Sequence, residues 1–586
     1  MCGICGIAST RGTVDPGRVA AMSATLVQRG PDSDGAYVDG PVGLAARRLA
    51  IIDLATGDQP ISNEDGRITV VQNGELYNYR ELRLELERAG HRFSTSGDTE
   101  VLVHLYEEHG ERFVERLRGM FALALWDEAR GRLVLARDRF GIKPLYLAEV
   151  ADGLAFASEL APLLALGASA EPDPEAIADY LVLGYVPGQR TGIAGARKLA
   201  PAHLLVHEDG RSREDAYWRA GPDFATDCYL EETLSEAVRL HLRSDVPLAV
   251  LLSGGLDSSL IASLAAQELD EPLRTFTVGF ADAAHDERGP AREVARAIGS
   301  VHEELVVETR VADDLPEIAA RLEQPLADAA AIPLWYLCRA VASEVKVALA
   351  GDGGDEVFGG YSRYAWDPVA ARLRALGPLG RLIPERGGRK SVVRRASKLL
   401  RHAAKPEAAR YLSWFALMDG DARAHVFERL FADAPGGLSP RARLQWVDLH
   451  SFVPDDLMLK ADKLSMAWSL ELRVPLLDHC VVEAGLALPD REKVRGVRTK
   501  VAIRRLVEGR LGTSIARRPK QGFDPPVERW LEGELRDLAG DALADLDGLV
   551  ERRAAERAGP AQRYALTMLS LWRSGLRARA RELVRH

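Results

Sequence analysis

Cys2 is the residue of this chain best suited to chemistry, because removal of Met1 would leave a thiol and a free α-amino group on one residue. The thiol can act as a nucleophile, and a nearby amine can act as its base. An α-amino group has a pKa of roughly 7.7–8.0, so it is readily neutral near physiological pH. The N-terminus therefore predicts nucleophilic catalysis by Cys2.

A second reactive segment lies at residues 248–259, LAVLLSGGLDSS, which predicts a buried strand, a glycine-rich turn and the start of a helix. Glycines let backbone N–H groups approach an anion, serine hydroxyls add donors, and a helix N-terminus favours negative charge. The turn lacks the Gly-Lys-Ser/Thr ending of a Walker A loop, which argues against P-loop phosphoryl transfer. A tight turn that binds nothing is the alternative interpretation of this segment alone.

Residues 350–356, AGDGGDE, predict a similar turn, which follows the strand-like run at 346–350. The loops that bind ligands in open α/β sheets follow the carboxyl ends of the strands, so Asp355 and Asp257 should meet at one edge. Carboxylate and phosphate oxygens are the ligands that Mg²⁺ prefers. The two turns together predict a magnesium-nucleotide site with Asp257 and Asp355 on the metal.

Further residues could serve the Cys2 chemistry. Asn73 can offer a side-chain amide and Gly74 an unobstructed backbone N–H to a tetrahedral intermediate. Arg48 and Asp98 form an opposite-charge pair that suits the carboxylate and ammonium groups of a free amino acid. In a protein without the other signals, Arg48 or Asp98 would be an ordinary surface charge.

Two kinds of element must position these residues. Residues 1–215 predict a layered α+β domain, with strands at 68–71 and 121–126 and a helix at 79–89. A polar stretch with a turn signal places the boundary between about residues 208 and 225, by composition.

Residues 216–586 predict a parallel sheet followed by a helical C-terminal extension, because strand-like and helical patterns alternate there. The predicted strands are 248–252, 273–280 and 346–350, and the predicted helices are 260–267, 291–298 and 334–341. From about residue 365 the composition becomes rich in Ala, Leu and Arg with helical spacing.

Composition narrows the class of protein. The net charge of -10, from 76 basic and 86 acidic side chains, argues against a general nucleic-acid binder. Five cysteines in 586 residues are too sparse for a secreted disulfide scaffold, and neither a membrane span nor a signal peptide is visible. We expect a cytoplasmic protein. The basic stretch 386–405 is read as a solvated helix face, with a phosphate-binding patch as the alternative.

The first third of the chain resembles the class II glutamine amidotransferase domain, an N-terminal-nucleophile (αββα) fold. The motifs that carry the resemblance are CGI at 2–4, RGPD at 29–32, RL at 48–49, NGELYN at 73–78, GDTE at 97–100 and RDRFG at 137–141. The resemblance implies attack of Cys2 on glutamine and an oxyanion hole from Asn73 and Gly74. It also implies a glutamine pocket of Arg48, Leu49, Ala50, Ile51, Ile52, Asn73, Gly74, Glu75 and Asp98. Gln28 departs from the histidine usual in the family.

The remainder resembles the synthetase domain of the glutamine-hydrolysing asparagine synthetases, a PP-loop (adenine nucleotide alpha hydrolase-like) fold. The motifs are SGGLDSS at 253–259, EQP at 323–325, GDGGDEVFGGY at 351–361, KADKLSM at 460–466 and ELRVP at 471–475. The resemblance implies that ATP adenylates aspartate, that Mg²⁺ assists, and that the protein is a homodimer. The implied ATP contacts are Leu252, Ser253, Gly254, Gly255, Asp257, Ser258, Val278, Ala350, Gly351 and Lys463.

Alternatives stay open at this stage. Asp352 stands where some members of the family carry glutamate, and we take it as a candidate base for incoming ammonia. Because its side chain is one methylene shorter, the acceptor could be a carboxylate other than aspartate, on a peptide, a cell-wall precursor or a natural product. A sensor that binds without turnover is the third hypothesis, although Cys2 and both loop aspartates are present. Cys2 and Cys5 could also form a metal site or a disulfide.

Overall fold

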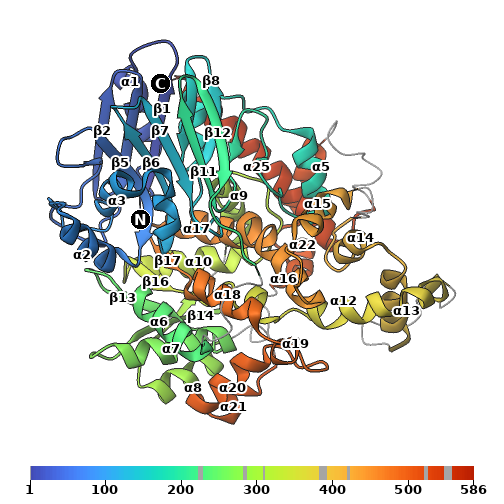
Figure 1. The fold of residues 1–586 in the computed structure, drawn as a ribbon. Coiled ribbons are helices and arrows are strands. Elements are labelled where there is room, and N and C mark those ends of the chain that lie inside the picture. Colours follow the sequence, from blue (N-terminus) through green and yellow to red (C-terminus); the bar gives the residue numbers. More distant parts are fainter. Residues whose placement is uncertain are drawn as a thin grey trace.

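The computed structural model describes residues 2–221, 229–280, 287–307, 310–381, 392–418, 423–519, 525–546 and 557–585. Residues 386–391 of the predicted basic stretch lie outside the described residues. Two antiparallel sheets and their helices form the N-terminal part, and a parallel sheet with helices forms the rest (Figure 1). This arrangement confirms the predicted αββα domain, the parallel-sheet domain and its helical extension.

The N-terminal part contains two six-stranded sheets with the strand orders β10-β8-β9-β1-β3-β2 and β12-β11-β7-β6-β5-β4. Their facing sides share one apolar core, to which Ile4, Leu44 and Val71 belong. The strands are β1 Cys2–Ser9, β2 Ser33–Asp39, β3 Val42–Arg48, β4 Ile61–Ser62, β5 Ile68–Leu76, β6 Gly119–Asp127, β7 Arg132–Arg137, β8 Tyr146–Val150, β9 Gly153–Ala157, β10 Arg197–Lys198, β11 His203–Glu208 and β12 Arg211–Ala216.

Helices cover the outer faces of both sheets. In α2, Tyr79, Leu82 and Leu86 are buried at helical spacing, and Gly90 ends the helix in the left-handed conformation. The helices α1, α4 and α5 pack on the first sheet, and α2 and α3 lie over the second. Their bounds are α1 Pro16–Ala24, α2 Tyr79–Ala89, α3 Val101–His109, α4 Leu160–Ala165 and α5 Pro174–Leu183, with a 3₁₀ turn at Gly110–Arg116.

The second part is built on a five-stranded sheet with the order β15-β14-β13-β16-β17. Each neighbouring pair of strands is parallel, so the carboxyl ends of β13 and β16 open at the same edge. The strands are β13 Leu248–Leu251, β14 Arg274–Phe280, β15 Val301–Val307, β16 Val347–Leu349 and β17 Glu471–Arg473. The sequence motif around β17 did not predict a strand there.

Helices flank this sheet and form the extension. The long α25 returns to the N-terminal part, where its Trp572 and Leu569 join the core beneath the first sheet (Figure 1). The helices are α6 Leu230–His241, α7 Leu256–Glu268, α8 Arg288–Ile298, α9 Val311–Leu322, α10 Ala331–Ala342, α11 Gly354–Phe358, α12 Ser362–Arg372, α13 Val392–Ala403, α14 Glu407–Leu412, α15 His425–Asp433, α16 Pro440–Leu449, α17 Met458–Met466, α18 His479–Ala487, α19 Asp490–Lys493, α20 Val501–Leu511, α21 Thr513–Ala516, α22 Val527–Glu532, α23 Arg536–Asp545 and α25 Pro560–Arg585.

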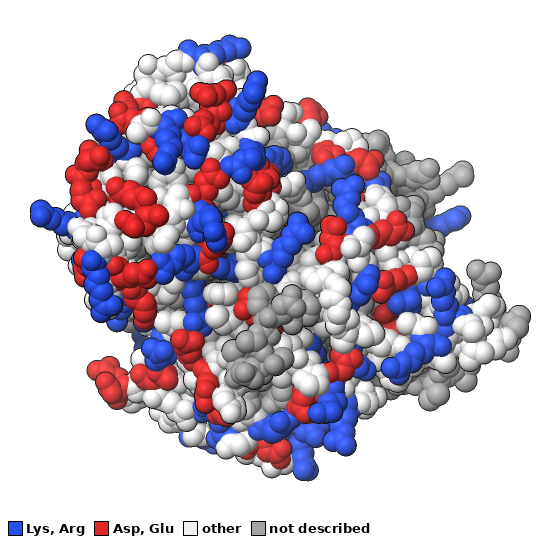
Figure 2. All heavy atoms as spheres, in the orientation of Figure 1, with Lys and Arg blue, Asp and Glu red and all other residues white. Residues whose placement is uncertain are grey.

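The surface carries both signs of charge. On the face shown in Figure 2, Lys and Arg side chains lie interspersed with Asp and Glu side chains. Among the described residues, no helix combines the length and the apolar character that a bilayer span requires.

Candidate active sites

Cys2 begins β1, which lies between β3 and β9 within the first sheet. The residue is buried, and its backbone pairs with Arg48 of β3. Cys5 lies three residues after Cys2 in the same strand and belongs to the core beneath the helices. Side chains alternate between the two faces of a strand, so the Cys5 side chain points away from that of Cys2. Both cysteines are free, and this strand geometry excludes the disulfide between them.

A small cavity of about 20 Å³ lies beside Cys2. It collects most of the predicted glutamine residues, although Ala50 and Asn73 do not line it. Gln59 and Thr99 also line it, and neither was predicted: the Gln59 Nε2 donates to the Cys2 sulfur at 3.8 Å and to Thr99 Oγ1 at 3.4 Å. The lining residues are Cys2, Arg48, Leu49, Ile51, Ile52, Gly57, Gln59, Ile61, Gly74, Glu75, Gly97, Asp98 and Thr99.

The two predicted charges of this cavity are held by local contacts. The Arg48 guanidinium donates to Asp58 Oδ1 at 2.9 Å and to the Ile52 carbonyl at 2.9 Å. The Asp98 carboxylate accepts the Leu76 N–H at 2.8 Å, and burial raises the pKa of Asp98. A free amino acid in this cavity would therefore meet a fixed cation and a fixed acid.

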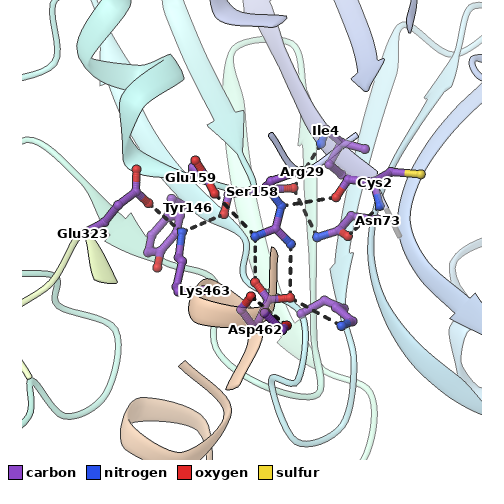
Figure 3. A network of polar contacts seen from close by, with 12 residues as sticks. Cys2, Ile4, Arg29, Asn73, Tyr146, Ser158, Glu159, Glu323, Asp462 and Lys463 are labelled. Atoms are coloured by element: carbon purple, nitrogen blue, oxygen red, sulfur yellow. Dashed lines mark hydrogen bonds and ion pairs between the residues drawn. The ribbon is translucent and has the colours of Figure 1, made fainter. Parts of the chain in front are cut away.

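Asn73 lies behind the nucleophile, completely buried. Its Oδ1 accepts the Cys2 N–H at 3.3 Å, and its Nδ2 donates to Ser158 Oγ at 3.3 Å (Figure 3). Gly74 has φ +147°, and a Cβ there would lie 2.0 Å from the Met120 carbonyl oxygen, so only glycine fits. The oxyanion role of the pair stays a prediction, because the Asn73 amide holds the nucleophile's nitrogen here.

Burial also controls the thiol. It raises the pKa of Cys2, although the positive N-terminus and Arg48 act against that shift. The resting thiol is therefore protonated at neutral pH, and attack requires a base close to the sulfur. The backbone nitrogen of the same residue would provide that base once Met1 is removed.

The second site is a cleft of about 510 Å³ at the carboxyl ends of β13 and β16. A Cβ on Gly354 would lie 2.5 Å from the Asp257 carboxyl carbon, so the two glycine-rich turns need glycine to meet. Nine of the ten predicted ATP residues line the cleft. They are Leu252, Ser253, Gly254, Gly255, Asp257, Ser258, Val278, Ala350 and Gly351.

Lys500 completes the cleft and was not predicted. It precedes α20 with φ +53°, and its ammonium contacts Asp257 and lies 2.6 Å from Asp355 Oδ1. Burial opposes the charge on Lys500, but the two carboxylates outweigh burial and raise its pKa. The Lys500 ammonium shows that a cation is accommodated between Asp257 and Asp355. Mg²⁺ takes oxygen ligands, so the two carboxylates also fit this ion.

Lys463, the tenth predicted ATP residue, lies outside the cleft lining, and its ATP contact stays a prediction. Its Nζ lies 2.5 Å from Glu323 Oε2 and donates to the Ser158 carbonyl at 3.3 Å, and the residue does not line the cleft (Figure 3). Lys460, one turn earlier on α17, lines the cleft instead and pairs with Asp328 and Asp456. The two lysines of one motif therefore have different carboxylate partners, although they lie one turn apart on α17.

Asp352, the candidate base, lies half-buried on the cleft wall. Burial raises its pKa, while the Lys460 ammonium lowers it and the neighbouring Asp257 carboxylate raises it further. A carboxyl group in such surroundings accepts a proton more readily than one in water.

A buried charge cluster connects the two sites. The Arg29 Nε donates to the Cys2 carbonyl at 3.3 Å, and its two terminal nitrogens donate to Asp462 of α17 at 2.8 and 3.1 Å (Figure 3). The Lys143 Nζ lies 3.3 Å from the same carboxylate. Burial favours neutral Asp462, but Arg29 and Lys143 prevail and lower its pKa to about 2. The backbone of the nucleophile is thereby tied to the helix that carries Lys460.

Asp462→Ala should lower the free energy of unfolding by about 3–5 kcal/mol, because Arg29 and Lys143 would stay buried without their carboxylate. Chemical denaturation followed by tryptophan fluorescence measures the loss. Arg83→Gln, which breaks the more exposed pair with Glu87, is the control and should cost less than about 1 kcal/mol. Equal losses in the two variants would contradict the structural role of the cluster.

Comparison with known proteins agrees with this layout. The family model described as "Glutamine amidotransferase domain" matches residues 1–218, and "Asparagine synthase" matches residues 229–584. Asparagine synthetase [glutamine-hydrolyzing] 1 of Bacillus subtilis is 35% identical over 549 residues, 90% of this chain and 87% of the relative. Asparagine synthetase [glutamine-hydrolyzing] 3 of the same organism is 30% identical, over 95% of this chain and 93% of the relative.

A solved structure of the allosteric regulatory enzyme of purine biosynthesis aligns with 53% of this chain and 82% of its own, at 16% identity and a TM-score of 0.30, which is too low to bear on the fold. The two family models and the near full-length relatives decide the assignment. The chain belongs to the family of glutamine-hydrolysing asparagine synthetases.

Proposed function

We propose that this enzyme converts aspartate to asparagine with glutamine as nitrogen donor and ATP as the activating substrate. Glutamine would be hydrolysed to glutamate and ammonia, and aspartate and ATP would form β-aspartyl-AMP and pyrophosphate. Ammonia then displaces AMP to give asparagine. The observation that carries the proposal is the presence, in one chain, of a thiol cavity at Cys2 and a separate anion cleft around Asp257. We assign residues 1–215 to the first half-reaction and residues 216–586 to the second.

In the first half-reaction, the Cys2 sulfur attacks the side-chain amide of glutamine, and its proton passes to the α-amino group of the same residue. The Gly74 N–H and the Asn73 amide stabilise the oxyanion. The amide C–N bond then breaks, ammonia leaves with the proton from the α-amino group, and water hydrolyses the Cys2 thioester to release glutamate. The buried Arg48 pairs with the glutamine carboxylate in place of Asp58, and Asp98 and Glu75 hold the ammonium group. Leu49, Ile51 and Ile52 supply the apolar wall of the cavity, and Ala50 links Leu49 to Ile51.

In the second half-reaction, the turn 253–259 holds the ATP phosphates through backbone N–H groups and serine hydroxyls. Asp257 and Asp355 would hold Mg²⁺, which neutralises phosphate charge when it is bound. Lys500 would move from the two carboxylates onto phosphate oxygens. Asp352 takes a proton from ammonia as nitrogen attacks the acyl-adenylate.

Lys500→Gln should reduce aspartate-dependent AMP formation by about 10²–10³-fold, because a cation aimed at the phosphates is lost from a shielded cleft. Lys463→Gln is the matched substitution of a buried lysine outside the cleft lining and should spare AMP formation with ammonium as nitrogen donor. Steady-state assays of AMP release compare the two. A larger defect in Lys463→Gln would restore that residue to the nucleotide site.

The acceptor is tested with a panel of carboxylic acids. Purified enzyme with ATP, Mg²⁺ and ammonium should release AMP with aspartate and not with glutamate, succinate, β-alanine or short aspartyl peptides. Preferential AMP release with one of the other acids would redirect the proposal to a different carboxylate, while both half-reactions would stand.

A further inference from the structure

A cluster of two histidines and two glutamates lies in the N-terminal part, and none of the four lines the cavity at Cys2 or the nucleotide cleft. His104 and Glu107 come from α3, His91 follows the end of α2, and Glu64 lies in the turn between β4 and β5. One potential ligand atom from each residue lies within 4.8 Å of every other. Three segments distant in sequence thus converge on one point.

The geometry points to a binding site for a divalent transition metal, best Zn²⁺, held by the Nδ1 atoms of His91 and His104 and the carboxylates of Glu64 and Glu107. Zinc in structural sites is tetrahedral, with bonds of about 2.0–2.2 Å to nitrogen and oxygen, which places neighbouring ligand atoms about 3.3 Å apart. The His104 Nδ1 lies 3.1 Å from Glu107 Oε2 and 3.3 Å from Glu64 Oε2. The His91 Nδ1 lies 3.7 Å from the same Glu107 Oε2 and 3.3 Å from the second Glu64 oxygen, Oε1, so the Glu64 carboxylate spans the two histidines with both of its oxygens.

The other nitrogens of both imidazole rings face carboxylates. The His91 Nε2 lies 3.2 Å from Glu108 Oε1, and the buried His104 Nε2 lies 3.7 Å from Glu100 Oε1, beyond hydrogen-bond distance. Metal-bound histidines characteristically direct the second ring nitrogen at a carboxylate, which fixes the tautomer and makes the ligand nitrogen more basic. Here both rings would carry the proton on Nε2 and turn the Nδ1 lone pair to the centre.

The carboxylates are held as well. Glu64 Oε1 accepts the Arg92 N–H at 2.9 Å, and Glu107 Oε1 accepts from Asn63 Nδ2 at 2.9 Å, so each carboxylate has an anchored oxygen. Of the four side chains, His104 is fully buried, His91 is 13% exposed, and the two glutamates are 28–36% exposed. Figure 2 shows acidic side chains gathered over the surface above α3. The cluster therefore has a buried side at His104, carboxylates that are held by hydrogen bonds, and a side open to solvent through which an ion can enter.

An excess of negative charge surrounds the two histidines. Glu64 and Glu107 lie near both rings, Glu108 lies near His91, and Glu100 lies near His104. A Zn²⁺ ion would supply two positive charges at their common centre and would link α3 to the two preceding segments. Glu100 also accepts the backbone N–H groups of Ser94 and Thr95, so the ion would brace the loop that carries Asp98.

The test uses tag-free, full-length protein, because a histidine tag would bind the probe. After chelator treatment and dialysis, Zn²⁺ is titrated against a chromophoric competitor for wild type, His91→Gln and the control His109→Gln, whose histidine ends α3 outside the cluster. Wild type should bind one Zn²⁺ at this site, and His91→Gln should weaken binding at least about 100-fold, since loss of a neighbouring orienting group alone costs 10–100-fold. The control should bind like wild type.

Co²⁺ provides a readout of the ligands. Wild type should show the visible d–d absorption of a tetrahedral nitrogen and oxygen site without a thiolate charge-transfer band, and the absorption should vanish in His91→Gln. If His91→Gln fails to fold, Glu64→Gln at the open side takes its place. Unchanged Zn²⁺ affinity in the folded variants, a thiolate band, or no Zn²⁺ binding by wild type would overturn the proposal, whereas asparagine synthesis tests the active sites separately.

Discussion

Cys2→Ala is expected to lower glutamine-dependent synthesis and glutamine hydrolysis by at least about 10⁴-fold, because a reaction that proceeds through a covalent intermediate loses its nucleophile. Synthesis from added ammonium should continue at the wild-type rate. The cavity beside Cys2 and the cleft around Asp257 have no lining residue in common, so loss of the thiol leaves the cleft intact. Coupled assays of glutamate and AMP measure the two reactions in one preparation.

The control for this variant is Cys5→Ala, a thiol removed from the same strand on the opposite face. It should retain glutamine hydrolysis, with a modest loss of stability from the vacated core position. A Cys2→Ala enzyme that fails with ammonium as well would contradict the separation of the two sites.

Asp257→Asn should reduce aspartate-dependent AMP formation by about 10³-fold or more, because one of two carboxylates that converge on a cation is lost beside the phosphates. Glutamine hydrolysis should be unaffected. Asn preserves the size of the side chain, so the close approach of Gly354 to this residue is kept. Pyrophosphate release across a range of Mg²⁺ concentrations should show a weaker dependence on the metal.

Asp270→Asn is the matched control, since Asp270 is exposed just beyond the other end of α7. It should behave as wild type in both assays. AMP formation at the wild-type rate by Asp257→Asn would remove the aspartate from the metal site and leave the glycine-rich turn as a structural element only.

Much of the fold was predictable because local patterns agree with the final packing. The helix predicted at 79–89 is α2, with its buried stripe and terminal glycine. The strand predicted at 68–71 extends to Leu76 in β5, because the polar residues Asn73 to Glu75 pair with β6 and are buried. A hydrophobic pattern ends where polar residues begin, so it could not show that this strand continues into the site. The same limit hid β17, a three-residue strand that contains Glu471 and Arg473.

The sequence predicted the site residues that lie together in one short segment, such as those in the turns at Asp257 and Asp355. Contacts between distant segments were not predictable. Lys500 lies 243 positions from Asp257 and meets it only because α20 begins beside the cleft. The motif at 460–466 did not show that Lys460, and not Lys463, lines the cleft. Gln59 reaches Cys2 from a loop with no periodic signal.

The most direct test of the central claim follows the nitrogen atom. Enzyme with the free Cys2 N-terminus receives amide-¹⁵N glutamine, aspartate, ATP and Mg²⁺, and mass spectrometry and chromatography identify the products. We predict ¹⁵N in the side-chain amide of asparagine, with glutamate and AMP formed in equal amounts. Glutamate and AMP without labelled asparagine, or ADP in place of AMP, would contradict the account.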